Sequence, residues 1–320
     1  MLTTPIVSRL VPIALLALPI APTAESLQLS SIDVPAATVK VFGEKYDRIT
    51  VGILALGVGA ELRLLADTVI LEADTVRMAP GGEIRADGRR GRHGQSGRHG
   101  NHGIRGTWGE AASNRTAEAA TPGGTGQPGS DGSDGKAGHT GGSGARLQIT
   151  FGTILTPLTI SARGGNGGNG GNGGNGGDGG EGGSGGRGSE MLPFRRGGHG
   201  GSGGDGGDGG AGGNGGSGGT IVVRYRNDWS RGGHRLFVDS GSGGRGGTGG
   251  MPGNGGRPGI PNADADVDGL VLLFSEYSPS SSSPGAVGKP GLGGPTGRPG
   301  DPGEASMEAL PAQWPAATIH

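Results

Sequence analysis

The fold is decided by the stretch Gly164-Gly-Asn-Gly-Gly-Asn-Gly-Gly-Asn-Gly-Gly-Asn-Gly-Gly-Asp178, which carries glycine at every third position and a second glycine beside it. The three-residue phase runs without a miss through six blocks, at residues 88–109, 123–144, 164–188, 197–218, 241–259 and 285–303. A flexible glycine-serine linker has no reason to keep such a phase. A strict period of three, with one face free of Cβ atoms, is typical of the polyproline-II helix. We therefore predict one such helix per block.

The glycines also predict how these blocks pack. Ordering a glycine costs roughly 1–2 kcal/mol of backbone entropy, and an isolated polyproline-II helix makes no internal hydrogen bond. Neighbouring blocks can offset this cost by exchanging backbone hydrogen bonds, which requires contact faces without Cβ atoms. Blocks 164–188 and 197–218 carry two glycines per triplet and are predicted to lie inside the bundle. Blocks 88–109, 123–144 and 285–303 should be peripheral, and the short connections 110–122 and 189–196 should allow antiparallel hairpins.

Composition bounds the possible folds. Glycine accounts for 80 of 320 residues, whereas the aromatic fraction is 3% and the apolar fraction 31%. This apolar content is low for one conventional core, so either most of the chain is disordered or something other than burial orders it. The net charge of −1 gives no bias toward nucleic acid or an anionic membrane. The absence of cysteine excludes disulfides, thiolate catalysis and zinc–thiolate sites.

Short apolar segments separate the glycine blocks. They are rich in β-branched residues and bounded by glycine, as strands are. They lie at residues 62–85, 147–151, 158–161, 220–225, 235–238 and 270–274, and residues 31–59 also favour strands. The predicted fold class is therefore mostly irregular and β, with little or no α-helix. It consists of a bundle of about six polyproline-II-type (polyglycine II) helices on a small β-sheet or β-solenoid base.

The N-terminus is typical of an export signal. Arg9 is the only charge before the apolar stretch 10–18, which is too short to span a bilayer, and small residues follow up to Ala24. The predicted division of the chain is a signal peptide at 1–24, a strand-rich base at 25–87, the glycine bundle at 88–303 with interleaved strands at 145–163, 219–240 and 266–277, and a tail at 304–320. We expect a secreted, extracellular or cell-surface protein without an integral membrane segment after signal cleavage.

The tract that begins at Gly164 resembles polyglycine-II helical-bundle proteins, a group that includes the snow flea antifreeze protein, phage tail-tip adhesins and mycobacterial glycine-rich repeat proteins. Block 285–303, with Pro290, Pro299 and Pro302, is similar to bacterial collagen-like repeats. The resemblance covers roughly residues 88–303 and concerns repeat style only. It implies a backbone architecture and no shared chemistry.

A calcium site is the best candidate for bound chemistry. An acidic run followed by Gly269 matches the opening of a D-x-D-x-D-G loop, in which alternate carboxylates converge on a hard cation. The closing glutamate of that loop falls one place late, at Glu276, and a strand follows instead of a helix. The alternative is an acidic turn before the next strand. The candidate metal ligands are Asp264, Asp266 and Asp268.

Other clusters have simpler explanations. Asp178 and Asp205 each end a G-G-x-G-x-D match to a calcium-binding nonapeptide, which the three-residue period explains without calcium. Histidines 93, 99 and 102 share one stripe, but successive stripe positions lie about 9 Å apart, too far to share a zinc ion. We expect solvated polar positions there. Several arginines make block 88–109 basic. Acids of neighbouring blocks could neutralise that charge, or it could bind polyanions or cell-surface glycans.

Motifs for catalysis are missing from the sequence. It contains no G-x-S-x-G, Walker or H-E-x-x-H pattern, and its many G-x-G-x-x-G matches lack a strand–helix unit around them. We predict a non-enzymatic structural or adhesion protein that displays polar faces and loops on a rigid scaffold. Its expected partner is a cell-surface glycan or protein and not nucleic acid; it needs no cofactor unless calcium binds. The alternatives are an ice-binding protein and a collagen-like trimeric matrix protein in place of a monomer.

Overall fold

A computed structural model describes residues 25–113, 115–116, 118–188, 195–261 and 282–311. Within these residues all regular secondary structure is β, and no helix is long and apolar enough to cross a membrane. The strands consist of β-branched residues or of alternating apolar and polar residues, both of which favour β-structure. They are β1 (Glu25–Val34), β2 (Val39–Phe42), β3 (Tyr46–Leu56), β4 (Glu61–Leu64), β5 (Thr68–Met78), β6 (Glu83–Arg85), β7 (Arg146–Ile154), β8 (Thr159–Ser161), β9 (Thr220–Asp228), β10 (Arg235–Phe237) and β11 (Glu304–Ala309).

The strands form two parallel sheets. The six-stranded sheet has the order β1-β3-β5-β7-β9-β11, and the five-stranded sheet has the order β10-β8-β6-β4-β2. Successive strands therefore alternate between the two sheets, and each pairs with the strand two places further along. This register stacks like residues in columns; one column contains Leu27, Ile49, Leu71, Ile149, Val223 and Met307.

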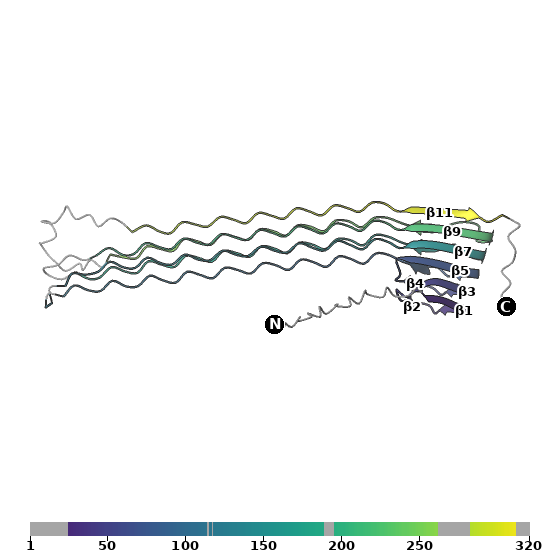
Figure 1. Cartoon of the computed structure of the whole chain (residues 1–320), viewed down its shortest axis with the longest axis horizontal. Coiled ribbons are helices and arrows are strands. Elements are labelled where there is room, and N and C mark those ends of the chain that lie inside the picture. Colours follow the sequence, from purple (N-terminus) through teal and green to yellow (C-terminus); the bar gives the residue numbers. More distant parts are fainter. Residues whose placement is uncertain (1–24, 114, 117, 189–194, 262–281, 312–320) are drawn as a thin grey trace, which may run out of the picture.

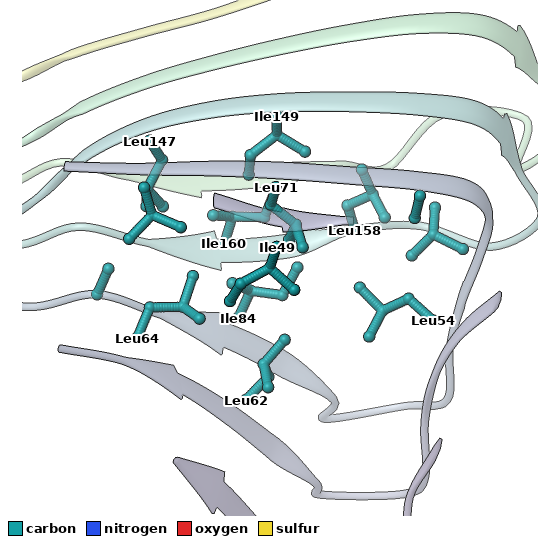
Figure 2. Packing of buried hydrophobic residues seen from close by; sticks show 14 of the residues in the cluster. Ile49, Leu54, Leu62, Leu64, Leu71, Ile84, Leu147, Ile149, Leu158 and Ile160 are labelled. Atoms are coloured by element: carbon teal, nitrogen blue, oxygen red, sulfur yellow. The ribbon is translucent and has the colours of Figure 1, made fainter. Parts of the chain in front are cut away.

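The hydrophobic core lies between the two sheets (Figure 2). Alternation directs every second side chain inward along much of the longer strands; in β5, for example, Val69, Leu71 and Ala73 are buried at alternate positions. The largest fully buried side chains lie in or beside strands and are Phe151, Ile32, Ile49, Leu54, Leu62, Leu71, Ile84, Leu147, Ile149, Ile154, Leu158 and Ile160. This core anchors everything that leaves the sheets.

The glycine blocks, numbered segments 1 to 6 in chain order, leave and re-enter the sheets at one end (Figure 1). Segments 1, 3 and 5 follow β6, β8 and β10, whereas segments 2, 4 and 6 lead into β7, β9 and β11. Segments 1, 3 and 5 form layer A, and segments 2, 4 and 6 form layer B. Each layer therefore continues one of the two sheets.

Backbone hydrogen bonds join the segments within and between the layers. Within layer A, Gly94 N donates to Asn169 O at 2.7 Å and Gly170 N to Arg245 O at 2.8 Å, in parallel register. Between layers the register is antiparallel, as the short hairpin connections predict. Segments 3 and 4 occupy the inside: segment 3 bonds to segments 1, 2, 4 and 5, and segment 4 to segments 2, 3, 5 and 6. Segment 2 bonds to segments 1, 3 and 4, so it is less peripheral than predicted.

The predicted fold class, a bundle of about six polyproline-II-type helices on a small β-sheet or β-solenoid base, is wrong. The described residues form a strand-rich fold of two parallel sheets, with six and five strands, and these sheets set the order of the glycine segments. The prediction failed because the chain-wide apolar fraction hid a local concentration. Apolar residues gather in the strands, where they suffice to fill the space between two sheets.

The predicted division of the chain also changes at its C-terminal end. Residues 304–309 belong to β11, which pairs with β9, so they are not part of an unstructured tail. Strands occur within the predicted ranges 25–87, 145–163 and 219–240. The predicted signal peptide at 1–24 and the predicted strand at 266–277 lie entirely outside the described residues.

The packing predicts opposite outcomes for two glycine substitutions. A Cβ atom at Gly174 would overlap the backbone carbonyl of Arg98, whereas a Cβ at Gly293 would meet only Gly247 O, at 3.8 Å. We expect Gly174→Ala to lower the free energy of unfolding by at least about 1–3 kcal/mol. Gly293→Ala should be neutral or stabilising by about 0.4–1 kcal/mol, because alanine restricts the unfolded chain. Chemical denaturation measures both; equal effects would contradict the close packing.

Candidate functional site

A ladder of side-chain acceptors crosses the exposed face of layer A. The asparagines of segment 3 use their Oδ1 atoms to accept hydrogen bonds from backbone N–H groups of segment 5. Asn172 accepts from Thr248 N at 3.1 Å. Equivalent bonds join Asn166 to Ser242, Asn169 to Arg245, Asn175 to Met251 and Asp178 to Asn254. These amides therefore satisfy N–H groups that the glycine-to-carbonyl bonds do not use.

The three histidines of segment 1 extend this ladder by one step. Their Nδ1 atoms accept hydrogen bonds from backbone N–H groups of segment 3, at 2.8 to 3.0 Å, in the pairs His93 with Asn169, His99 with Asn175 and His102 with Asp178. Each ring is thus engaged separately along the segment. Within the described residues no group of three or more His, Cys, Asp or Glu side chains could hold a metal ion.

Aspartates play the same part on the exposed face of layer B. Asp131 Oδ1 accepts from Asp205 N at 2.7 Å, and Asp205 Oδ1 in turn accepts from Lys289 N at 2.7 Å. Asp134, Asp208 and Leu292 repeat the arrangement one triplet further on. Asp178 and Asp205, the aspartates of the nonapeptide matches, are therefore backbone-capping groups here.

The sequence pattern alone predicts display surfaces at these stripes and does not reveal the capping function. The partner of each asparagine lies 76 residues away in the chain, so no local pattern reveals it. One signal was available, because short side chains with an acceptor recur at the same triplet position in several blocks. The calcium candidates Asp264, Asp266 and Asp268 lie outside the described residues.

One edge of the glycine slab is basic. Segment 1 contains no acidic residue, and the edge-facing positions of segment 2 are also free of acids. Serines of segment 2 mark this edge, since Ser133 Oγ accepts from Arg98 N at 2.7 Å. Lys136 and His139 share the phase of Ser133, so they lie on the same edge. We call the row formed by Arg89, Arg92, Lys136 and Arg98 the basic edge.

Among the described residues, acids pair with arginines of the basic segment only near its two ends. Arg89 pairs with Glu44 of the sheet region, and at the far end Arg105 lies 3.7 Å from Glu181. Between them the described residues provide no ion pair for the cations of the basic edge, which are exposed. Asp131 and Asp134, two of the neighbouring acids that could neutralise this charge, cap backbone groups on layer B instead.

A Ser-His-Asp cluster lies in the turn between β9 and β10. Ser230 Oγ donates to Asp228 Oδ1 at 2.6 Å, and His234 Nε2 lies 2.9 Å from Asp228 Oδ2 and 3.1 Å from Ser230 Oγ. The backbone N–H of Leu158 donates to Nδ1 of the imidazole at 3.1 Å. In the neutral ring the proton therefore sits on Nε2, and this nitrogen cannot accept the serine proton.

This arrangement is a turn-stabilising network, because the serine lacks a base. Burial acts to raise the pKa of Asp228, but hydrogen bonds from Ser230 and His234 outweigh it, and the pKa is lowered. Arg231 and Gly232 adopt φ values of 62° and 86° in the same turn. The network holds this left-handed turn over the end of the core.

An open cavity of ≈ 310 Å³ lies at the turn ends of the six-stranded sheet. Asp33 and Arg77 are its charged lining residues, and the Thr156 hydroxyl already accepts a hydrogen bond from Met78 N at 2.6 Å. The remaining lining is mostly apolar and small. These side chains supply no set of groups for acid–base, nucleophilic or metal chemistry.

No protein-family model matches this chain, and no curated protein is similar to it in sequence. Among solved structures, one match is the nine polyproline type II helical bundle antifreeze protein of the springtail Granisotoma rainieri. The two chains are 23% identical. The match covers 65% of this chain and 93% of the springtail chain, with a TM-score of 0.12. A TM-score this low carries no argument about fold or function.

The ladder predicts a local effect of Asn172→Ala. This substitution removes the acceptor of Thr248 N, so amide exchange at Thr248 should accelerate and the free energy of unfolding fall by about 0.5–1.5 kcal/mol. Ser184→Ala, on the same stripe, is the matched control because the Ser184 side chain makes no hydrogen bond to any other described residue. Equal exchange at Thr248 in both variants would show that water replaces the amide at no cost.

The turn network predicts a defined acid dependence. Because the pKa of Asp228 is lower in the folded state than its unfolded value of ~3.9, its carboxylate stabilises the fold above that value. The contribution is lost as the pH falls through the folded-state pKa. Asp228→Asn should therefore reduce stability at neutral pH, and the difference from the parent protein should shrink below about pH 4. Thermal unfolding across that range checks this; a difference independent of pH would contradict it.

Proposed function

We propose that this chain is a secreted or cell-surface structural or adhesive protein, without enzymatic activity, in which a stiff glycine slab presents its polar faces to a partner. The observation that carries the proposal is a hydrogen-bond ladder that runs unbroken from sheet to slab. Ala86 N donates to Ser161 O at 2.7 Å, and Gly88 N donates to Arg163 O at 2.7 Å. Gly91 N then continues the ladder into segment 3.

A joint built in this way resists bending. Asp87 reinforces it, because its Oδ1 accepts hydrogen bonds from the buried Ser161 hydroxyl and from Arg163 N. One end of the slab is thereby fixed to the apolar core, and each further bond adds a net ~0.5–1.5 kcal/mol. Many such bonds in phase keep the six segments from moving independently. Stiffness over this length suits a spacer or a display scaffold.

The contacts within the chain favour a single-chain scaffold over a collagen-like trimer. In a triple helix, glycines must face two other chains. Here the in-phase glycines already face carbonyls of this chain; a Cβ at Gly170, for example, would overlap the carbonyl of Gly210. No bare glycine face is left over for partner chains in the central segments. A monomer in sedimentation would agree with this proposal, and a trimer would contradict it.

Ice binding is the alternative from another class. It would call for a flat, regular face of small side chains, largely Thr, Ala and Val. The exposed stripe of segment 3 carries Asn, Asp, Glu and Arg, and segment 1 carries His and Arg. These charged stripes do not favour it. Thermal hysteresis of the purified protein measures ice binding directly.

Two measurements test the scaffold proposal. Small-angle scattering of the purified protein should give the profile of an elongated, rigid particle, because the slab cannot bend at the sheet. Gly174→Ala, which removes the close contact between segments 1 and 3, should make the profile more flexible, whereas Gly293→Ala should leave it unchanged. Surface labelling of intact producing cells should detect the protein outside the cell or in the medium. A flexible-coil profile, or a protein found only inside cells, would overturn the proposal.

A further inference from the structure

The cations of the basic edge form a regular row. Hydrogen bonds between segments 1 and 2 set the levels: Gly142 N bonds to Arg89 O, His139 N to Arg92 O, Lys136 N to Gln95 O and Ser133 N to Arg98 O. Lys136 therefore occupies the level of Gln95, which would otherwise interrupt the row. One cation stands at each of four successive triplet levels, namely Arg89, Arg92, Lys136 and Arg98.

We propose that this edge binds a linear acidic polysaccharide with widely spaced anionic groups, such as one carboxylate or sulfate per disaccharide. Successive levels are three residues apart, so neighbouring cations lie at most about 10 Å apart along the slab. Duplex DNA carries one charge per ~1.7 Å, a much denser array. The row also lacks the aromatic side chains on which single-stranded bases stack.

The surroundings direct such a ligand to the edge. Arg92, Arg98 and Lys136 are exposed and have no ion-pair partner among the described residues, so binding breaks no existing pair. Arg90 is a further exposed cation beside the row, and it too has no ion-pair partner within the part of the chain that the structure describes. The exposed face of layer B carries Asp131, Asp134, Asp205 and Asp208. The aspartates of that face repel a polyanion, whereas the cations of the basic edge attract it.

This inference rests on the proposed function, because it names the ligand class of an adhesive scaffold. The test compares binding of the full-length protein to hyaluronan, which has one carboxylate per disaccharide, with binding to neutral dextran and to single-stranded DNA. The edge variant is Arg92→Gln with Arg98→Gln and Lys136→Gln. The control variant, Arg245→Gln with Arg257→Gln and Lys289→Gln, removes the same charge from exposed positions elsewhere on the slab.

We expect hyaluronan binding that weakens with added salt, and no binding to dextran. The edge variant should bind at least about tenfold more weakly, and the control variant should bind as the parent protein does. Equal losses in both variants, no hyaluronan binding, or tighter binding to DNA would each overturn the inference. If the protein is rigid and attaches to cells, but the edge variant attaches equally well, the scaffold function stands and this inference fails.

Discussion

The structure depends on contact between backbones, in which a glycine N–H meets the carbonyl oxygen of a neighbouring segment at 2.7 to 3.1 Å with no Cβ between them. A hydrogen bond of this kind contributes little by itself, and ordering glycine is costly in entropy. The contributions become sufficient only because the bonds repeat at every triplet across six segments and share the same register. A single methyl group inside the slab disturbs contacts on more than one neighbour.

The two sheets set this register, because they position the end of each glycine segment that joins a strand. Their parallel strands are held by an apolar core, and each layer of the slab continues one sheet, so the first bond of every segment forms beside a strand that is already placed. Loop closure is thereby much cheaper than it would be for free glycine chains. The core and the slab thus supply different things: burial provides the free energy that fixes position, and backbone hydrogen bonds extend that order outward.

Polar side chains serve the same end before they serve any ligand. Asparagine, aspartate and histidine acceptors cap outward N–H groups on both faces, whereas Arg92, Arg98 and Lys136 of the basic edge have no ion-pair partner among the described residues. This division separates the residues that hold the slab from those that are free to contact a partner. A net charge of −1 is compatible with this basic edge, because the acids of the slab lie mainly on segments 2, 3 and 4, whereas segment 1 contains none.

The sequence by itself determined that glycine would be the contact residue, that segments 3 and 4 would lie inside, and where most strands occur, because period-three glycine and alternating apolar residues are local patterns. Tertiary structure alone decided that the strands form two parallel sheets, that Asn172 caps Thr248, and that Lys136 completes a row begun by Arg89. Each of these depends on the register between residues far apart in the chain. A repeat of three residues is compatible with many registers, and only the packing of the apolar core between the sheets selects one.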